Sequence, residues 1–415
     1  MSKLALLGGS AIRTRPFMGW PEVDMDKMET ALLRVLHSKK WGSLHGSETR
    51  QFETEFAAYQ DARFGIACSN GTIALQIALN ALEIGPGDEV ILPAYSFIAS
   101  AVAVLGCRAI PVFADMDPET YTIDIESVES LISERTRAIM PVHIGGRPAD
   151  MDALENLAQK HGLVIVEDAA QAWGSVYKNR KVGAIGQCGT FSFQSSKNIT
   201  SGEGGIILTN DENLAGRIAS WVNCGRKKDG LWYAHYLPAG NQRLTEFQSA
   251  VLRAQLEDYD HQKTIRQKNA RFLDQKLQSL PCFRPISAND DYQSSIHIYI
   301  VRYFQEEAGG IPKSRMIDAL KAEGLMTHGG YSLPLYEQPV FSESHFFPKN
   351  CPFECKHSNV VRDYSSIRLP HSEKACRDEA IWIPQSLFLG SESDMMDIVA
   401  IFEKVFENHK DLFDG

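Results

Sequence analysis

Between residues 60 and 210, short apolar runs alternate with segments in which apolar residues recur every three or four positions. The short runs have the length of strands, and the periodic segments have the length of helices. We expect strands at residues 64–68, 89–92, 109–113, 138–143, 163–166, 190–193 and 205–209, and helices at 72–82, 98–105, 125–132 and 151–161. The alternation predicts an α/β fold, with a mostly parallel seven-stranded sheet that has helices on both faces.

The pattern changes in the last third of the chain. A helical periodicity runs without interruption from about residue 245 to 277, followed by a strand pattern at 297–304 and helical patterns at 314–323 and 391–407. This order is typical of a smaller α+β domain joined to the first by a long helix. We therefore predict a large domain over residues 1–260, including an N-terminal arm, and a small C-terminal domain over residues 261–415.

Composition and charge narrow the range of functions. The 415 residues are 44% hydrophobic and carry a formal net charge of −10, which argues against a nucleic-acid partner, because such binders depend on basic patches. The longest apolar run, residues 97–107, is too short to span a membrane. Scattered cysteines favour a reducing cytoplasm. Cys351, Cys355 and His357, with His345 nearby, match no closed four-ligand pattern, so we expect free thiols and no metal.

Lys197 is the first candidate for chemistry. It follows a predicted strand and lies in FSFQSSKNITSGEGG, residues 191–205. A lysine becomes a Schiff-base nucleophile when its surroundings lower its pKa. Most lysines in polar loops are ordinary surface residues, so Lys197 gains significance only from the residues that accompany it.

Asp168 is the first of these companions and lies in VIVEDAAQAWGS, at the end of a predicted strand. The ends of parallel strands are where α/β folds bind ligands. Pyridoxal 5′-phosphate needs a carboxylate against its pyridine nitrogen, because a protonated ring accepts electrons better. Gln171 follows three residues later and could reach the ring hydroxyl. The alternative role for Asp168 is that of a helix N-cap.

The second companion is the Ser-Asn-Gly-Thr turn at residues 69–72, between a predicted strand and a predicted helix. Free N–H groups at a helix start, together with hydroxyl groups, can bind a phosphate. The same residues are also common in helix caps, so this turn alone is a weak signal.

Several segments, in the same order, resemble the DegT/DnrJ/EryC1/StrS family of sugar aminotransferases. They include SNGTIALQIAL, GDEVILPAYSF, MPVHIGGRPADMDAL, EDAAQAWGS, FSFQSSKNITSGEGGIILTND and GNQRLTEFQSAVLRAQL. The resemblance covers almost the whole chain. It implies the fold of aspartate aminotransferase (fold type I), pyridoxal 5′-phosphate as cofactor, and a homodimer with shared active sites.

The resemblance also implies roles for individual residues. Lys197 corresponds to the lysine that binds the cofactor covalently, Asp168 to the partner of the pyridine nitrogen, and Gln171 to the contact of the ring hydroxyl. Gly71, Thr72 and Ser192 correspond to the phosphate site. Phe97 corresponds to the aromatic residue stacked on the ring, and Asn241 to the residue that reaches the partner subunit's phosphate. Whether Phe97 stacks on the ring or belongs to the core, we expect it to be buried.

For the substrate side, the resemblance indicates His143, Tyr331 and Tyr336, although His143 could equally be a structural histidine. Near the C-terminus, the chain reads IWIPQSLFLGSESD where many nucleotide-sugar members have a proline-histidine pattern. This stretch is more similar to the branch acting on cyclitol ketones and 3-amino-5-hydroxybenzoate precursors.

The predicted reaction is therefore the transfer of an amino group from glutamate or glutamine to a keto-sugar or keto-cyclitol. Three alternatives stay open. A dehydratase of the same family would have histidine in place of Lys197. A 3-amino-5-hydroxybenzoate synthase-like enzyme would share the C-terminal pattern. A non-catalytic, cofactor-binding regulator could use the same fold.

Overall fold

The seven predicted strands form one sheet in the computed structural model, which describes residues 3–231, 233–286, 292–342, 351–352 and 363–413. The strand order is β1 (Phe64–Cys68), β9 (Gly205–Thr209), β8 (Cys188–Ser192), β5 (Val164–Asp168), β4 (Thr136–Ile139), β2 (Glu89–Pro93) and β3 (Ile110–Ala114). β9 is antiparallel to β1 and β8, and the remaining neighbours pair in parallel. The predicted α/β fold with a mostly parallel sheet is confirmed.

Alternate residues of each strand are buried on opposite faces of this sheet. In β2, Val90 and Leu92 pack into one core and Ile91 packs into the other, as the period of two along a strand requires. Helices cover the first face with α3 (Gly71–Ala81), α4 (Ile98–Gly106) and α7 (Glu212–Val222), and the second with α2 (Glu48–Tyr59), α5 (Ile125–Leu131) and α6 (Met151–His161). Because both faces are covered, the strands read as continuous apolar runs in the sequence.

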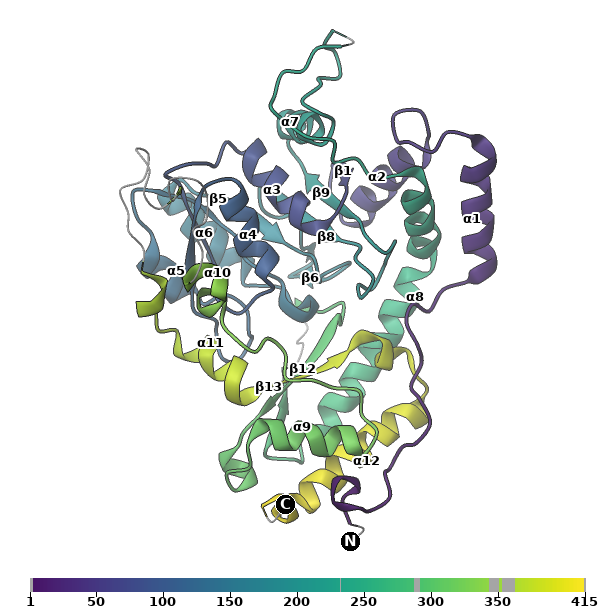
Figure 1. Cartoon of the computed structure of the whole chain (residues 1–415), viewed down its shortest axis with the longest axis vertical. Coiled ribbons are helices and arrows are strands. Elements are labelled where there is room, and N and C mark those ends of the chain that lie inside the picture. The colour runs from purple at the N-terminus through teal and green to yellow at the C-terminus, as the bar shows by residue number, and fades with distance from the viewer. Residues whose placement is uncertain (1–2, 232, 287–291, 343–350, 353–362, 414–415) are drawn as a thin grey trace.

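Helix α8 (Glu246–Leu277) connects the two parts of the molecule (Figure 1). Thr245 begins it with a capping box, in which its side chain and that of Gln248 each bond to the other's backbone, a strong N-terminal signal. The first half packs on α1 (Met25–Ser38) and α2, and the second half contacts β10 and α12. The predicted boundary at residue 260 thus falls inside a continuous helix.

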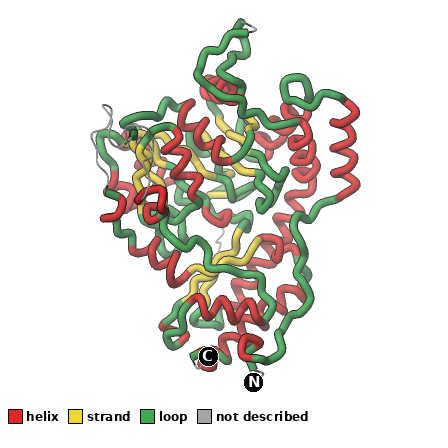
Figure 2. Tube along the Cα trace, in the orientation of Figure 1, coloured by secondary structure: helices red, strands yellow, loops and turns green. Residues whose placement is uncertain are grey.

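The C-terminal part contains an antiparallel sheet of β10 (Phe283–Pro285), β12 (Ile298–Tyr303) and β13 (Ala380–Pro384), with α9 (Lys313–Ala322) and α12 (Glu392–Glu407) beside it (Figure 2). Two short helices, α10 (Pro339–Ser342) and α11 (Pro370–Lys374), precede β13. A small sheet joins the two parts, because β11 (Tyr292–Gln293) pairs with β6 (Val176–Tyr177), which pairs with β7 (Arg180–Lys181).

The N-terminal arm returns to the C-terminal part, where Leu4 is buried in its core. Each helix in the described residues is too short or too polar to cross a lipid bilayer. Cys355, His357 and His345, which were weighed as metal ligands, lie outside the described residues.

Candidate active site

A cleft of about 1170 Å³ opens where β1, β2, β5 and β8 end. Its walls come from loops that follow these strands, from the N-terminal arm through Trp20, and from the C-terminal part through His297, Tyr331, Trp382 and Gln385. Because the carboxyl ends of parallel strands meet at one edge of a sheet, residues distant in sequence converge there. Most of the residues predicted from the sequence line this cleft: Gly71, Thr72, Phe97, Asp168, Gln171, Ser192, Lys197 and Tyr331.

Lys197 lies in the loop after β8, with its side chain partly buried in the cleft wall. Its backbone N–H donates to Gln194 O (2.9 Å), which tightens the loop. Burial lowers the pKa of the Lys197 amine to about 8, while the nearby Asp168 carboxylate opposes the shift. About a quarter of such amines are neutral at pH 7.5, against about one in a thousand for an ordinary lysine. The site therefore makes Lys197 a usable nucleophile and base.

Asp168 is the last residue of β5 and is buried. Its Oδ2 accepts a hydrogen bond from Ser100 Oγ (2.7 Å), and its Oδ1 accepts one from the Ala170 backbone N–H (3.2 Å). Burial raises the pKa of the Asp168 carboxyl, and these two donors and Lys197 oppose that shift. Ser100 in turn lies 3.0 Å from Ser96, which lines the cleft. Two hydrogen bonds thus fix the orientation of this carboxylate, which lies near the Lys197 amine.

Gln171 is held in one orientation by the loop after β4. Its Oε1 accepts from the Gly145 backbone N–H (2.7 Å), so its Nε2 is the group that faces Tyr331 Oη, at 3.5 Å. The Tyr331 ring packs edge-on against Tyr95 and Trp382, with centroids 5.3 and 4.7 Å away. Gln171 and Tyr331 therefore form one rigid polar corner of the cleft.

The first turn of α3 forms a second polar corner. Asn70 caps the helix by accepting from the Ile73 backbone N–H (2.9 Å), whereas the N–H groups of Gly71 and Thr72 donate to no group within the described residues. A Cβ atom at Gly71 would lie 2.8 Å from Ser192 Cβ, so the close approach of these two segments requires glycine. Free N–H groups at a helix start, beside a serine hydroxyl, form an anion site.

Phe97 corrects one sequence expectation. It precedes α4 as the N-cap residue, and its side chain is 58% exposed at the cleft. The alternative of a core Phe97 was wrong, because the extended backbone before α4 directs the ring toward the open cleft and away from the core. Its stacking on a cofactor ring stays a prediction. Its ring face is available to a planar ligand.

His143 and Tyr336 do not line the cleft, which corrects their assignment to the substrate side. His143 is buried, with Nε2 3.0 Å from Glu167 Oε2 and Nδ1 accepting from the Ala149 backbone N–H (3.1 Å). Both ring nitrogens are thus occupied by structural contacts. Tyr336 Oη donates to Glu373 Oε1 (2.6 Å), and its ring packs near Phe113 in the core.

Asn241 also lies outside the cleft of its own chain. It is exposed, and its Oδ1 accepts from the Arg243 backbone N–H (3.3 Å). The sequence assigned Asn241 to a neighbouring subunit's site, and its exposed position is compatible with that assignment.

Sequence reasoning missed His297, which lines the cleft with Lys197. Asn198 connects the two, because its Nδ2 donates to Ser295 O (3.1 Å) and Ile296 O (3.3 Å) while its Oδ1 is 2.9 Å from His297 Nδ1. Ile296 has φ +53°, a conformation that β-branched residues rarely adopt. Only the three-dimensional fold brings residues 197 and 297 together, so the sequence offered no signal for His297.

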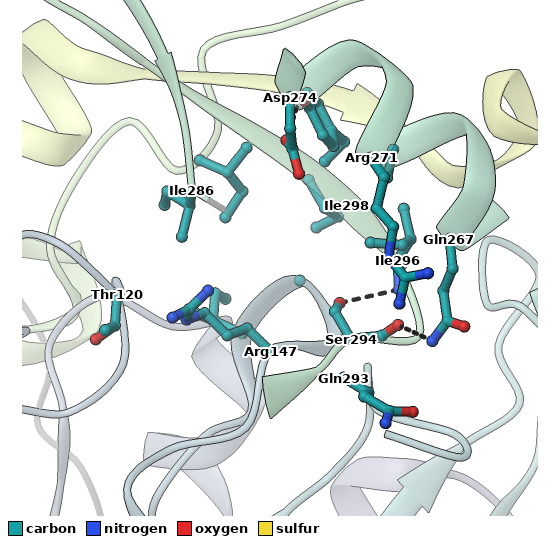
Figure 3. Close-up of a pocket in the computed structure, with 15 residues that line it drawn as sticks. Thr120, Arg147, Gln267, Arg271, Asp274, Ile286, Gln293, Ser294, Ile296 and Ile298 are labelled. Atoms are coloured by element: carbon teal, nitrogen blue, oxygen red, sulfur yellow. Dashed lines mark hydrogen bonds between the residues drawn. The ribbon is translucent and has the colours of Figure 1, made fainter. Parts of the chain in front are cut away.

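A smaller pocket lies behind this segment, with Arg147, Arg271 and Asp274 around it (Figure 3). Here Gln267 Nε2 donates to Ser294 O (2.8 Å) and the Ile296 backbone N–H donates to Ser294 Oγ (3.0 Å). These bonds hold the strained backbone at Ile296 in place. None of the residues predicted from the sequence lines this pocket.

Comparisons with known proteins agree with this geometry. The model of the DegT/DnrJ/EryC1/StrS aminotransferase family matches residues 23–392. The chain is 37% identical to the L-glutamine:2-deoxy-scyllo-inosose aminotransferase of Streptomyces lividus and 36% identical to the enzyme of that name from Streptomyces fradiae, each over 99% of both chains. The solved structure of 3-amino-5-hydroxybenzoic acid synthase has a TM-score of 0.85 at 30% identity, covering 96% of this chain and 100% of that one.

The lowered pKa of Lys197 predicts how its reactivity depends on pH. In the cofactor-free protein, modification of Lys197 by an amine-acylating reagent should rise to a plateau with a midpoint near pH 8, well below the ordinary lysine value of about 10.4. Asp168→Asn should move the midpoint lower still, because it removes the charge that stabilises the ammonium form. Peptide-resolved mass spectrometry measures both. A rate that still climbs at pH 10, or a midpoint raised by Asp168→Asn, would contradict the described electrostatics.

Proposed function

We propose that this chain, which belongs to the DegT/DnrJ/EryC1/StrS aminotransferase family, transfers an amino group from glutamine to a keto-cyclitol by means of pyridoxal 5′-phosphate. The enzyme class predicted from the sequence is confirmed, and the chain is an aminotransferase. The proposed cofactor and substrates rest on one observation: Lys197 and Asp168 lie in the same cleft as the free N–H groups of α3.

The residues present fit this cofactor. Pyridoxal phosphate carries an aldehyde, a basic ring nitrogen and a phosphate, and the cleft offers a partner of suitable chemistry for each. Lys197 would hold the aldehyde carbon, Asp168 the ring nitrogen, and Gly71, Thr72 and Ser192 the phosphate. The exposed ring of Phe97 supplies an apolar face for the pyridine ring, and the Gln171 amide supplies a donor for its hydroxyl group.

When bound, the cofactor supplies an electron sink that stabilises negative charge at the Cα of the amino donor. Asp168 keeps the proton on the ring nitrogen, because an ionised carboxylate in a buried site favours a cation beside it. The neutral amine of Lys197 is the base that accepts the proton from the donor Cα. Since Lys197 is half neutral near pH 8, it can both take up and return a proton at physiological pH.

The relatives favour a cyclitol over the other ketones that the sequence left open. Two of them are named for glutamine as donor and 2-deoxy-scyllo-inosose as acceptor, and their similarity extends over 99% of both chains. The 3-amino-5-hydroxybenzoic acid synthase is less similar, at 30% identity, and is the second candidate. Lys197 argues against the dehydratase alternative, and the relatives named as aminotransferases argue against a non-catalytic regulator.

We further propose a homodimer with shared active sites. Helix α1 exposes Leu32, Leu33 and Leu36, with 38%, 41% and 46% of their surfaces accessible, and these leucines are close enough in sequence to form an apolar patch. Trp41, on the loop after α1, is 53% exposed. Asn241 lies outside its own cleft. A second copy of the chain would cover the apolar surface and bring an amide toward the anion site of α3.

Lys197→Ala should abolish transamination of glutamine and remove the visible absorption of the bound cofactor, because Lys197 is the one lysine among the described residues that line the cleft. Borohydride reduction of the wild-type holoenzyme followed by peptide mapping should place the cofactor on residues 191–205. Lys227→Ala, which changes an exposed lysine, is the matched control and should keep full activity. Label on Lys227 or Lys181 would refute the assignment.

Asn241→Ala should weaken cofactor retention if the partner's phosphate depends on this amide. Mixing it with Lys197→Ala should restore about one intact site in each heterodimer, because one subunit then supplies Lys197 and the other supplies Asn241. Activity after unfolding and co-refolding measures this, alongside each variant refolded alone. A fully active monomer in sedimentation, or the absence of complementation between two severely impaired variants, would refute shared sites.

A further inference from the structure

Arg266 is a buried cation that lies directly behind the cleft. It comes from the interior of α8 and is 0% exposed. Its Nε donates to Gln385 Oε1 (2.8 Å) and its Nη2 to Gln262 Oε1 (3.1 Å), while Nη1 is buried with no partner within the described residues. Burial lowers the pKa of Arg266 to about 10, so it stays charged at neutral pH.

No aspartate or glutamate in the described part of the chain pairs with this guanidinium; both of its acceptors are neutral amides. The ring of Trp20 covers it, 5.5 Å from the ring centroid to Cζ. Burying a charge without a counter-ion is strongly unfavourable. Such a charge next to a binding cleft is therefore a marker of function, because a bound anion would provide the missing compensation.

The guanidinium fixes the orientation of Gln385. Since arginine only donates, the amide oxygen of Gln385 must face Arg266, and its Nε2 must point elsewhere. Gln385 is 3% exposed and lines the cleft. Its Nε2 makes no hydrogen bond within the described residues and is not among the fully buried unpaired atoms, so it faces the open cleft. A charge behind an amide also strengthens its N–H groups as donors.

Gln385 therefore offers its N–H donors to a ligand in this part of the cleft, and the positive charge of Arg266 lies behind them. The anion site at α3 belongs to a different wall, built from residues 70–73 and Ser192. A keto-cyclitol has only neutral oxygens, whereas an amino-acid donor always carries a carboxylate. A carboxylate is the ligand that both satisfies the amide and compensates the guanidinium.

We propose that Gln385, held by Arg266, binds the carboxylate of the amino donor. This inference rests on the proposed function, because it assumes that an amino acid enters the cleft. It makes Gln385 a substrate-binding residue and Arg266 a positioning residue that acts through it. The pair should then affect the half-reaction with the amino acid and leave the half-reaction with the ketone unchanged.

Gln385→Glu is the sharpest variant, because it keeps the acceptor for Arg266 and the shape of the side chain but replaces the N–H₂ group with a carboxylate oxygen. In the holoenzyme, the glutamine concentration that half-saturates the first half-reaction should rise roughly tenfold to a hundredfold, the loss expected for a charge-assisted hydrogen bond. Half-saturation by 2-deoxy-scyllo-inosose in the second half-reaction should change less than about twofold, because this ketone has no carboxylate for Gln385 to bind. Rapid-mixing absorbance measures both.

Gln262→Met is the matched control. Gln262 accepts from the same guanidinium, but it lies outside the cleft. This variant should leave half-saturation by glutamine within about twofold of wild type, as expected for a residue that does not touch the ligand. A rise equal to that of Gln385→Glu would overturn the proposal, because the loss would then occur with the Arg266–Gln385 bond and the Gln385 N–H groups still in place. A rise confined to the ketone half-reaction would also overturn it and assign Gln385 to the acceptor.

Equilibrium binding provides a readout that does not depend on turnover. By titration calorimetry, the wild-type holoenzyme should bind glutarate at least about tenfold more tightly than the neutral glutaramide, and Gln385→Glu should lose this preference. If wild-type enzyme transfers no amino group from glutamine, the proposed function fails, while the glutarate titration still tests the carboxylate site. If transfer occurs but Gln385→Glu keeps the glutarate preference, only this inference fails.

Discussion

The burial of Asp168 and Lys197 in one cleft is the constraint on which the site depends. Each charge would be costly in this position alone, and each moderates the other's pKa shift. Parallel strands β5 and β8 are neighbours in the sheet, so their carboxyl ends hold the two groups on a rigid frame. Ser100 fixes the carboxylate from behind. Burial disfavours the charged form of Lys197 and so lowers its pKa to about 8, which leaves part of the amine neutral near neutral pH.

The C-terminal part completes this site with groups that the sheet does not supply. Asn198, adjacent to Lys197, bonds to the backbone of Ser295 and Ile296, so the lysine loop and the segment before β12 form one unit. The strained φ of Ile296 is retained because hydrogen bonds hold the segment on both sides. Arg266 contributes a second buried cation, which bonds to Gln385 in the cleft wall. The cleft thus has polar groups from the sheet and from the C-terminal part on its walls.

Periodicity and local chemistry were enough to predict the sheet, the long helix α8, and the segments that contain Lys197, Asp168 and Gly71. Those signals are local, since a strand followed by a turn residue is visible in a single stretch of sequence. The errors concern side-chain environment. The core alternative for Phe97 was wrong, because its ring faces the open cleft, and His143 and Tyr336 have structural partners in Glu167 and Glu373. Ser100, His297 and Gln385 were missed because their roles arise from contacts between distant segments, which no local pattern encodes.

The central claim is that this cleft moves an amino group from glutamine to a cyclitol ketone. The most direct measurement loads the protein as pyridoxamine phosphate and follows the return of the visible cofactor band on addition of single ketones. The account predicts that 2-deoxy-scyllo-inosose restores the band and leaves as an aminated product in mass spectrometry, in amounts equal to the loaded cofactor. Restoration by nucleotide-linked keto-sugars with none by the cyclitol ketone would contradict it.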